Sequence, residues 1–420
     1  EDLPEGGTHA AKARARHYTR IIWAFTFVLL NASLGPPQVR GHVKRTDDVR
    51  EYRGRILKYQ FLNTKNTLTL ICSLNRMHLM KACGMRFALL ALIGAMVAAP
   101  AFAATRQYYI AAEDGMWDFA PLGKNLVHCH PDKAPCDIPE PWTNSHTFPV
   151  SRFIQYADAS FSTPVPQPVW LGILGPIIRA EVGDTVKIHF CNHATSGSYG
   201  MHPHGFRYNK DNEGAHYFGV DANAQPGAGA SVAPGECFNY TWIADNDSGP
   251  APGELSSKVW WYHSHINEPA ETNAGLLGPI IITRAGFARR DGSPKDVDKE
   301  FVTAFFIFNK ADGEERGLMH SINGYIFGNL RGLVMRNGQK VRWHVMGMGN
   351  EIDLHTPHWH GKTLQIGKGV AARRTDVIEL LPGSMVTADM KADNPGEWLY
   401  HCHVADHIDA GMQTTYRILP

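Results

Sequence analysis

The sequence predicts an all-β protein with two similar domains, and three observations carry this prediction. Its apolar runs are short and rich in β-branched and aromatic residues, for example at 186–190, 237–243 and 384–390. Turn-forming residues separate these runs, with 40 glycines and 26 prolines among 420 residues. Residues 104–420 show no long amphipathic helical pattern and fall into two related halves. Short strands with frequent turns are typical of β-sandwiches and β-barrels.

The N-terminal part differs from the rest in charge and pattern. Residues 1–103 hold 15 of the 41 Lys and Arg but 6 of the 40 Asp and Glu, which leaves 26 and 34, a formal net charge of −8, for residues 104–420. Met85-Arg86, a following apolar run and Ala101-Phe102-Ala103 form the pattern of a secretory signal peptide. We therefore expect a non-native or extended leader at 1–84 and a signal peptide at 85–103. The mature protein would then be secreted or periplasmic.

Composition excludes several classes of protein. With 44% hydrophobic and 19% charged residues, the chain is not disordered as a whole. Lys and Arg form no basic block, so we expect no nucleic-acid partner. The apolar run at 21–30 is too short to cross a bilayer, and we expect no membrane span. Seven cysteines are too few for a disulfide scaffold, although export permits single bridges. Possible pairs are Cys129 with Cys136 and Cys191 with Cys237, among three connectivities that the sequence leaves open.

An internal repeat divides residues 104–420. Four landmarks of the first copy are answered in the same order in the second, including His-Pro-His-Gly by His-Trp-His-Gly and Trp-Tyr-His-Ser-His by Leu-Tyr-His-Cys-His. Four matches in one order indicate two copies of one domain. Gly, Pro and charged residues cluster at 284–299. We expect domain one at 104–288 and domain two at 289–420.

Histidine is unusually common, with 22 residues against 13 Met and 14 Tyr. Four His-x-His pairs occur, two in each copy. Because residues i and i+2 of a strand point to the same face, each pair offers two imidazoles to one place. Neutral imidazoles without interleaved carboxylates suit a borderline metal such as copper. The predicted ligands are His202, His204, His263, His265, His358, His360, His401 and His403.

The second copy contains a further set of metal-binding residues. Two histidines, a cysteine thiolate and a weak axial methionine are the ligand set of a blue-copper electron-transfer site. The residues with this chemistry are His355, Cys402, His407 and Met412. At the matching positions the first copy has Tyr199, Ser264, Pro269 and Ala274. All four candidate ligands are thus absent together from the first copy, which predicts one mononuclear site per chain.

These motifs make the chain resemble the multicopper oxidases, and within them the ceruloplasmin-like branch. The segments that carry the resemblance are 168–178, 262–266, 346–356 and 401–412. The resemblance implies two cupredoxin domains, which are Greek-key β-barrels. It also implies a homotrimer in which a copper cluster lies between domain one of one subunit and domain two of the next.

The resemblance assigns a role to each ligand and implies four coppers per active unit. His355, Cys402, His407 and Met412 would hold the type 1 copper, and His202 with His358 the type 2 copper. The other six predicted histidines would hold the type 3 pair. A donor would give single electrons to the type 1 copper, and dioxygen would be reduced to water at the trinuclear cluster.

The sequence leaves the electron donor open. The resemblance implies electron uptake at His407, with Asp406 and Asp376 as catalytic carboxylates near it. A phenol or aromatic amine, as for a laccase, is the first interpretation, because a single carboxylate can take a phenolic proton. A ferrous or cuprous ion is the alternative. For ferrous iron the expected carboxylate is replaced by Asn309 or Lys310, and no methionine-rich tract supports cuprous oxidation.

Two further classes remain as alternatives. A copper nitrite reductase also has two such domains, but it needs only a mononuclear catalytic copper rather than eight cluster histidines. A binding module without catalysis would have lost copper ligands, whereas this chain keeps all twelve candidate positions. The complete ligand set therefore favours an oxidase over both.

Overall fold

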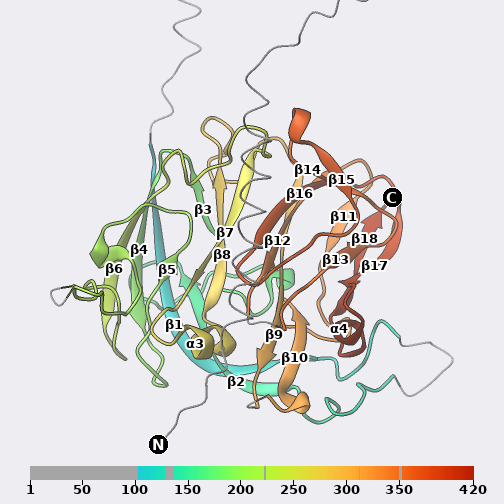
Figure 1. Ribbon diagram of the computed structural model, residues 1–420, viewed down its shortest axis with the longest axis horizontal. Coiled ribbons are helices and arrows are strands. Elements are labelled where there is room, and N and C mark those ends of the chain that lie inside the picture. The colour runs from blue at the N-terminus through green and yellow to red at the C-terminus, as the bar shows by residue number, and fades with distance from the viewer. Residues whose placement is uncertain (1–102, 129–135, 222–223, 312, 350–351) are drawn as a thin grey trace, which may run out of the picture. The chain divides into compact units, whose positions relative to one another are not determined.

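The computed structural model describes residues 103–128, 136–221, 224–311, 313–349 and 352–420 (Figure 1). The expected leader at 1–84 and nearly all of the expected signal peptide at 85–103 lie outside these residues. Among the residues described, no helix is both long and apolar enough to cross a membrane. The prediction of an all-β protein is confirmed, because the strands of the described residues form four sheets and their helices have at most seven residues.

Residues 105–283 form two four-stranded sheets, in the orders β2-β1-β4-β6 and β3-β8-β7-β5. Their strands are β1 (Thr105–Asp118), β2 (Thr147–Tyr156), β3 (Ile178–Glu181), β4 (Thr185–Asn192), β5 (His202–Pro203), β6 (Cys237–Ile243), β7 (Ser257–His263) and β8 (Leu277–Thr283). The short helix α3 (Glu268–Ala274) connects β7 to β8. Further 3-10 turns are η1 (Val169–Leu171) and η2 (Lys210–Asn212).

Residues 299–419 form a six-stranded sheet, β10-β9-β12-β16-β14-β15, and a four-stranded sheet, β11-β18-β17-β13. Their strands are β9 (Lys299–Asn309), β10 (Leu318–Ile322), β11 (Val334–Arg336), β12 (Lys340–Gly347), β13 (Pro357–Trp359), β14 (Leu364–Ile366), β15 (Arg373–Thr375), β16 (Met385–Lys391), β17 (Gly396–Cys402) and β18 (Gln413–Leu419). The short helix α4 (Ala405–Asp409) lies between β17 and β18, and the 3-10 turns are η3 (Glu315–Gly317) and η4 (Gly369–Ala371).

The repeat in the sequence corresponds to a repeat of strand topology. β1 pairs in parallel with β4 as β9 does with β12, and β3 pairs in parallel with β8 as β11 does with β18. The antiparallel pairs β5–β7 and β7–β8 are matched by β13–β17 and β17–β18. The two sets of sheets therefore place equivalent sequence positions at equivalent points of the fold.

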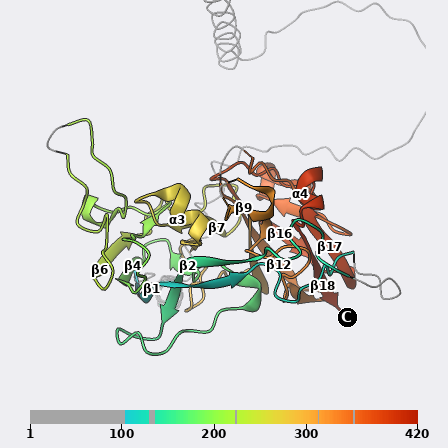
Figure 2. The ribbon, with the colours of Figure 1, turned by 90° about the horizontal axis from the view of Figure 1, so that it is seen from below.

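Three apolar cores hold the sheets together. One core lies within residues 110–282 and includes Trp242 and Tyr262, and a second lies within residues 301–418 and includes Trp343 and Trp359. The third contains Trp261 and other residues of β7 and β8 together with residues of β9 and β12. The two sets of sheets lie side by side in both ribbon views (Figures 1 and 2). This third core fixes one set of sheets against the other.

A buried ionic network reinforces this contact. The Arg342 side chain is 0% exposed, donates to Asp389 at 2.7 and 2.9 Å, and donates to the hydroxyls of Ser256 and Ser257 at 2.6 and 2.9 Å. A buried guanidinium with this many acceptors is fully compensated, which is the condition under which a buried charge is tolerated. Because the two serines belong to β7 or precede it, the network ties β7 to β12 and β16.

One of the two possible disulfides is confirmed. Cys191 and Cys237 face each other across the antiparallel pair β4–β6 and are bonded. Cys136 also belongs to a disulfide, whose other cysteine lies outside the described residues. Cys402 is a free, buried thiol.

Candidate metal centre

Strand pairing brings the predicted histidines together in two groups of four. In the pair β5–β7, His202 lies directly opposite His263, and in β13–β17, His358 lies directly opposite His401. The second histidine of each His-x-His pair follows two residues later on the same face. The first half-set consists of His202, His204, His263 and His265. The second half-set consists of His358, His360, His401 and His403.

The first half-set is arranged around His202. Its ring centroid lies 5.1–5.5 Å from those of the other three histidines. His204 Nε2 and His263 Nε2 face each other at 3.1 Å. His202 Nδ1 donates to the Glu213 carbonyl at 2.7 Å, and this hydrogen bond fixes the ring and leaves Nε2 for a metal.

The second half-set repeats this geometry around His358. Its centroid lies 4.9–5.5 Å from the other three rings, and His360 Nε2 faces His401 Nε2 at 3.1 Å. His358 Nδ1 donates to the Asp376 carbonyl at 2.9 Å. Asp376 thus contacts the second half-set through its backbone, while its side chain is exposed. Among the described residues, no hydrogen bond or ion pair joins the Asp376 carboxylate to His407, near which the sequence predicted it to accept a proton.

The buried histidines of both half-sets are neutral at physiological pH. Burial, followed by the charges of neighbouring histidines, lowers the pKa of His204 to about 4. Burial also dominates for His263, whose pKa falls to about 3, and for His401, whose pKa falls to about 4. Metal ligation requires the neutral imidazole, so these side chains are ready to bind a metal without losing a proton first.

A carboxylate distinguishes the first half-set from the second. Glu268, in the first turn of α3, approaches His265 Nε2 at 3.2 Å and His263 Nε2 at 3.8 Å. The sequence interpretation took the histidines to be free of carboxylates and missed this residue. A signal was present, because Glu268 follows His265 at the spacing at which Asp406 follows His403.

The two half-sets are separate from each other within one chain. All ring contacts that these eight described histidines make with one another stay within a half-set. The possible metal groups formed by the described residues likewise contain members of one half-set only. One chain therefore presents two separate groups of four imidazoles.

The predicted thiolate set, His355, Cys402, His407 and Met412, comes together in the core of the second set of sheets. His355 Nδ1 and His407 Nδ1 are 3.2 Å apart, and the Cys402 Sγ lies 4.0 and 3.6 Å from them. Met412 is fully buried, and its carbonyl accepts from the Cys402 amide at 3.0 Å. Two imidazole nitrogens converging on one sulfur, with a methionine beside them, fit a blue-copper ion.

The surroundings prepare Cys402 and His355 for ligation. Burial raises the pKa of Cys402, but hydrogen bonds from His355 and His407 outweigh it and lower that pKa to about 6. His355 Nε2 donates to the buried Asp353 carboxylate at 3.1 Å, so its Nδ1 faces the sulfur. Such a carboxylate–histidine pair fixes the ring tautomer of a metal ligand. The sequence interpretation did not identify Asp353.

The first copy fills the same place with hydrogen-bonded neutral groups. Ser264, at the position of Cys402, accepts from the Gly200 amide at 3.1 Å. Tyr199, at the position of His355, places its hydroxyl 2.7 Å from the Ser196 hydroxyl. Pro269 and Ala274 belong to α3. These side chains offer neither a thiolate nor an imidazole, so the first copy has no second mononuclear site of this kind.

A histidine that the sequence interpretation missed lies beside the thiolate set. His320, in β10, is 6% exposed, and its ring centroid is 5.2 Å from that of His407. Neither ring nitrogen of His320 has a hydrogen-bond partner among the residues that the structure describes. Burial first, and the neighbouring His407 second, lower the pKa of His320 to about 4, so the ring is neutral with an available lone pair.

Carboxylates occur on α4 and at the turn before β10, the strand that contains the buried His320. Asp406, in α4, is exposed and acts electrostatically on His320. Glu314 and Glu315 lie at the turn η3, which leads directly into β10. Glu314 pairs with Arg316 at 2.7 Å, whereas the Glu315 carboxylate makes no ion pair or hydrogen bond with the described residues. By contrast, Lys310 is turned inward, since its ammonium donates to the Asn273 carbonyl at 3.0 Å.

Comparison with family models gives two matches on this chain. Both models are described as multicopper oxidase, and they match residues 154–286 and 302–420. A solved structure described as a multicopper oxidase aligns with 75% of this chain and 89% of its own, with a TM-score of 0.52 and 21% identity. At that identity the likeness shows the fold alone, namely the cupredoxin-like fold of these oxidases.

Curated relatives are larger proteins. The human proteins named ferroxidase HEPHL1 and hephaestin are each 36% identical to this chain over 75% of it, and the match covers 29% of each relative. Human ceruloplasmin is 33% identical over 80% of this chain and 33% of its own length. The chain thus spans about a third of the length of the curated relatives that it matches.

Proposed function

Because the chain belongs to the multicopper oxidases, a copper-dependent family of oxidoreductases, we propose that it couples one-electron oxidation of a donor to reduction of dioxygen to water. The thiolate set would hold a type 1 copper. The two half-sets would hold one type 2 and two type 3 coppers, with His202 and His358 on the type 2 ion. Bound copper would supply the one-electron chemistry that the side chains lack. The geometry of the thiolate set is the observation that carries this proposal.

Cys402 connects the two kinds of site. Its backbone neighbours His401 and His403 belong to the second half-set, so a covalent path of one peptide unit joins sulfur to imidazole. The His401 Nδ1 also donates to the Cys402 carbonyl at 2.6 Å, which adds a hydrogen-bonded path. This hydrogen bond orients the His401 ring and leaves its Nε2 for a metal.

We further propose that the trinuclear site forms between chains. Each chain carries one first half-set and one second half-set, which make no ring contact with each other. A cyclic homotrimer would bring the first half-set of one subunit to the second half-set of the next and complete every site. Such a closed ring uses the same interface three times.

We propose ferrous iron as the electron donor, in preference to the phenol or aromatic amine that the sequence interpretation placed first. The supporting observation is His320, a neutral, buried imidazole with two unpartnered nitrogens next to the ligand His407. Asp406 and Glu315 add carboxylates suited to a hard cation. The names of two relatives, each ferroxidase HEPHL1, agree with this donor. Four ferrous ions would each lose one electron, and one dioxygen with four protons would yield two water molecules.

A phenolic donor is the second candidate, and one surface feature favours it. Leu354 and Leu381 are 47% and 62% exposed, and each is adjacent in sequence to a member of the His355–Leu380 bridge. Exposed apolar side chains beside a buried ligand offer an aromatic ring a contact surface. Cuprous oxidation has no comparable supporting feature.

Oxygen uptake by the copper-loaded protein, with ferrous iron and a dimethoxyphenol in parallel, tests the donor. We expect His320→Phe, which keeps ring volume but removes both nitrogens, to lower kcat/KM for ferrous iron by about tenfold or more, as loss of one metal-binding group does. The phenol rate should not change. A matched control is His193→Phe, since His193 pairs with Glu113 in the first set of sheets. Equal losses with both donors, or no loss with iron, would overturn the ferrous assignment.

We also propose export of the protein, on the basis of the signal-peptide pattern at 85–103. N-terminal sequencing of the protein recovered from the culture medium or periplasm should begin near Ala104. Recovery of an uncleaved cytosolic protein would contradict this proposal.

A further inference from the structure

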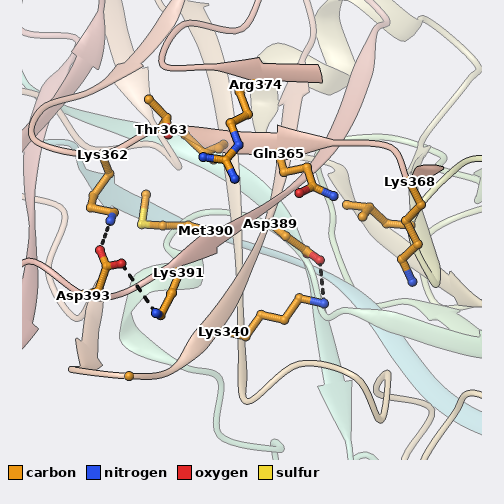
Figure 3. Close-up of a pocket in the computed structure, with 13 residues that line it drawn as sticks. Lys340, Lys362, Thr363, Gln365, Lys368, Arg374, Asp389, Met390, Lys391 and Asp393 are labelled. Atoms are coloured by element: carbon orange, nitrogen blue, oxygen red, sulfur yellow. Dashed lines mark hydrogen bonds and ion pairs between the residues drawn. The ribbon is translucent and has the colours of Figure 1, made fainter. Parts of the chain in front are cut away.

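A basic cavity opens on the six-stranded sheet. Its volume is about 560 Å³, and it is lined by residues of β12, β14, β15, β16 and the adjoining loops (Figure 3). Leu364 and Met390, both buried, form its apolar floor. This volume suits a small molecule rather than a single ion. None of the residues that line the cavity belongs to the half-sets or the thiolate set.

Cationic side chains dominate its wall. The five that line it are Lys340, Lys362, Lys368, Arg374 and Lys391, against the two carboxylates Asp389 and Asp393. Residues 104–420 as a whole carry a formal net charge of −8, so this excess of positive charge is not the general character of the surface. Local charge of one sign inside a concave wall raises the concentration of ligands of the opposite sign.

Carboxylates compensate part of this charge, and one of them, Asp296, lies outside the lining and pairs with Lys368 at 3.2 Å and Lys340 at 3.7 Å. Asp389 already binds the buried Arg342 through both oxygens, and Lys340 approaches it at 3.0 Å from the cavity side. Asp393 is shared by Lys362 and Lys391, the latter at 3.9 Å. Figure 3 shows the pairs that Lys340, Lys362 and Lys391 make with these two aspartates, and the Arg374 guanidinium directed toward the space between them.

Arg374 is the unpaired cation of the wall. Among the described residues its guanidinium has no hydrogen bond or ion pair, although it is positioned at the cavity by the strand pair β14–β15. An arginine fork binds phosphate or sulfate oxygens through two parallel hydrogen bonds, while lysines contribute point charges around it. No aromatic side chain lines the cavity, so it lacks the stacking surface by which single-stranded nucleic acid is held.

We propose that this cavity binds a small polyanion with two or more phosphate or sulfate groups. The Arg374 guanidinium would bind one group, and Lys391 would turn from Asp393 toward another. The Lys391–Asp393 pair is exposed enough to exchange partners, since the Lys391 side chain is 73% exposed, whereas the Lys362 side chain is 12% exposed and keeps Asp393 as its partner. The site is separate from the metal centre and does not depend on the identity of the electron donor.

Titration calorimetry on the copper-loaded full chain tests the proposal. The probes are inositol hexasulfate, whose sulfate groups bind copper weakly, and pyrophosphate, with the copper content measured before and after. We expect saturable binding of one molecule per chain that weakens steeply as salt is raised. Arg374→Ala with Lys391→Ala should weaken binding by at least tenfold, while Arg374→Lys should weaken it less.

Arg417→Ala with Lys295→Ala provides the matched control, because it removes the same charge at exposed positions outside the cavity. Equal weakening in this control would overturn the proposal by showing a general charge effect. Absence of saturable binding by both probes would also overturn it, as would binding of a long sulfated polymer alone. Unchanged oxygen uptake and blue absorption in the cavity variant would show that the variant is folded and that the metal centre is unaffected.

Discussion

A mixing experiment with two inactive variants tests whether the trinuclear site is shared between chains. One variant, His202→Ala with His204→Ala, destroys the first half-set. The other, His358→Ala with His360→Ala, destroys the second. None of these four histidines belongs to an apolar core, and the thiolate set is unchanged in both variants. Both should therefore keep the blue copper while losing oxygen uptake.

The expected recovery follows from the separation of the half-sets. Suppose that each site takes its first half-set from one chain and its second from a neighbour. A working site then requires the variant with an intact first half-set in one position and the variant with an intact second half-set in the other. Random assembly of an equal mixture gives this arrangement at about one quarter of the sites, and a three-to-one mixture gives about 19%. Recovered activity should follow the product of the two fractions.

The assay is oxygen uptake normalised to blue absorption, because every chain contributes one thiolate set whichever variant it is. The two variants are co-expressed at several ratios, and mass spectrometry of the intact oligomers verifies that they contain both. If such mixed oligomers show no activity at any ratio, the site does not form between chains and the shared-cluster proposal is refuted. Activity in a light-scattering monomer would refute it as well.

Four further predictions concern single side chains. Cys402→Ser should abolish the blue absorption and the oxygen uptake with every donor. Ser264→Ala, at the equivalent position of the first copy, should leave the absorption and the oxygen uptake unchanged, and their loss in this variant would contradict the assignment of Cys402 as the copper ligand. Glu268→Gln should lower copper affinity at the first half-set roughly 10–100-fold in chelator competition while the blue copper is retained, and an unchanged affinity would count against its role. Arg342→Met should reduce the free energy of unfolding in urea by about 3–5 kcal/mol, because it leaves the buried Asp389 carboxylate without its guanidinium partner, and a neutral result would show that the network contributes no net stability. Burial raises the pKa of Glu300, but its arginine and histidine partners outweigh burial and lower that pKa. Ionised Glu300 therefore stabilises the folded state fully above the unfolded pKa of about 4.3, and this stabilisation is lost as the pH falls through the lower folded pKa. Glu300→Gln should therefore flatten the acid limb of the stability curve, which urea titrations between pH 6 and 3 would reveal.

The strand repeat was predictable from the sequence because its landmarks lie on equivalent strands. The matched segments around His202 and His358 fall on β5 and β13, and those around His263 and His401 fall on β7 and β17. The parallel pairs β1–β4 and β9–β12 were not predictable. A period-two pattern marks a strand and its buried face, but the pairing partner is chosen by contacts far away in the sequence.

The ligand residues were predictable for a similar reason. Cys402 and its flanking histidines are contiguous, so a strand or its end must present them together. His320 carries no such mark, because its closeness to His407 arises only when β10 packs beside the thiolate set. Asp353 stands two residues before His355, and this spacing was a signal that the sequence interpretation did not use. The position of Asp376 also required the structure, since its backbone rather than its carboxylate contacts His358.

The two copies together separate what the fold needs from what the chemistry needs. Both copies share the strand pairings that surround these positions, although the first has Ser264 and Tyr199 where the second has Cys402 and His355. The neutral groups of the first copy satisfy their own hydrogen bonds, so the barrel does not require metal ligands at these positions. In the second copy the same positions hold a thiol of lowered pKa and an imidazole oriented by a buried carboxylate. Stability does not account for that combination, whereas the type 1 copper site proposed above does.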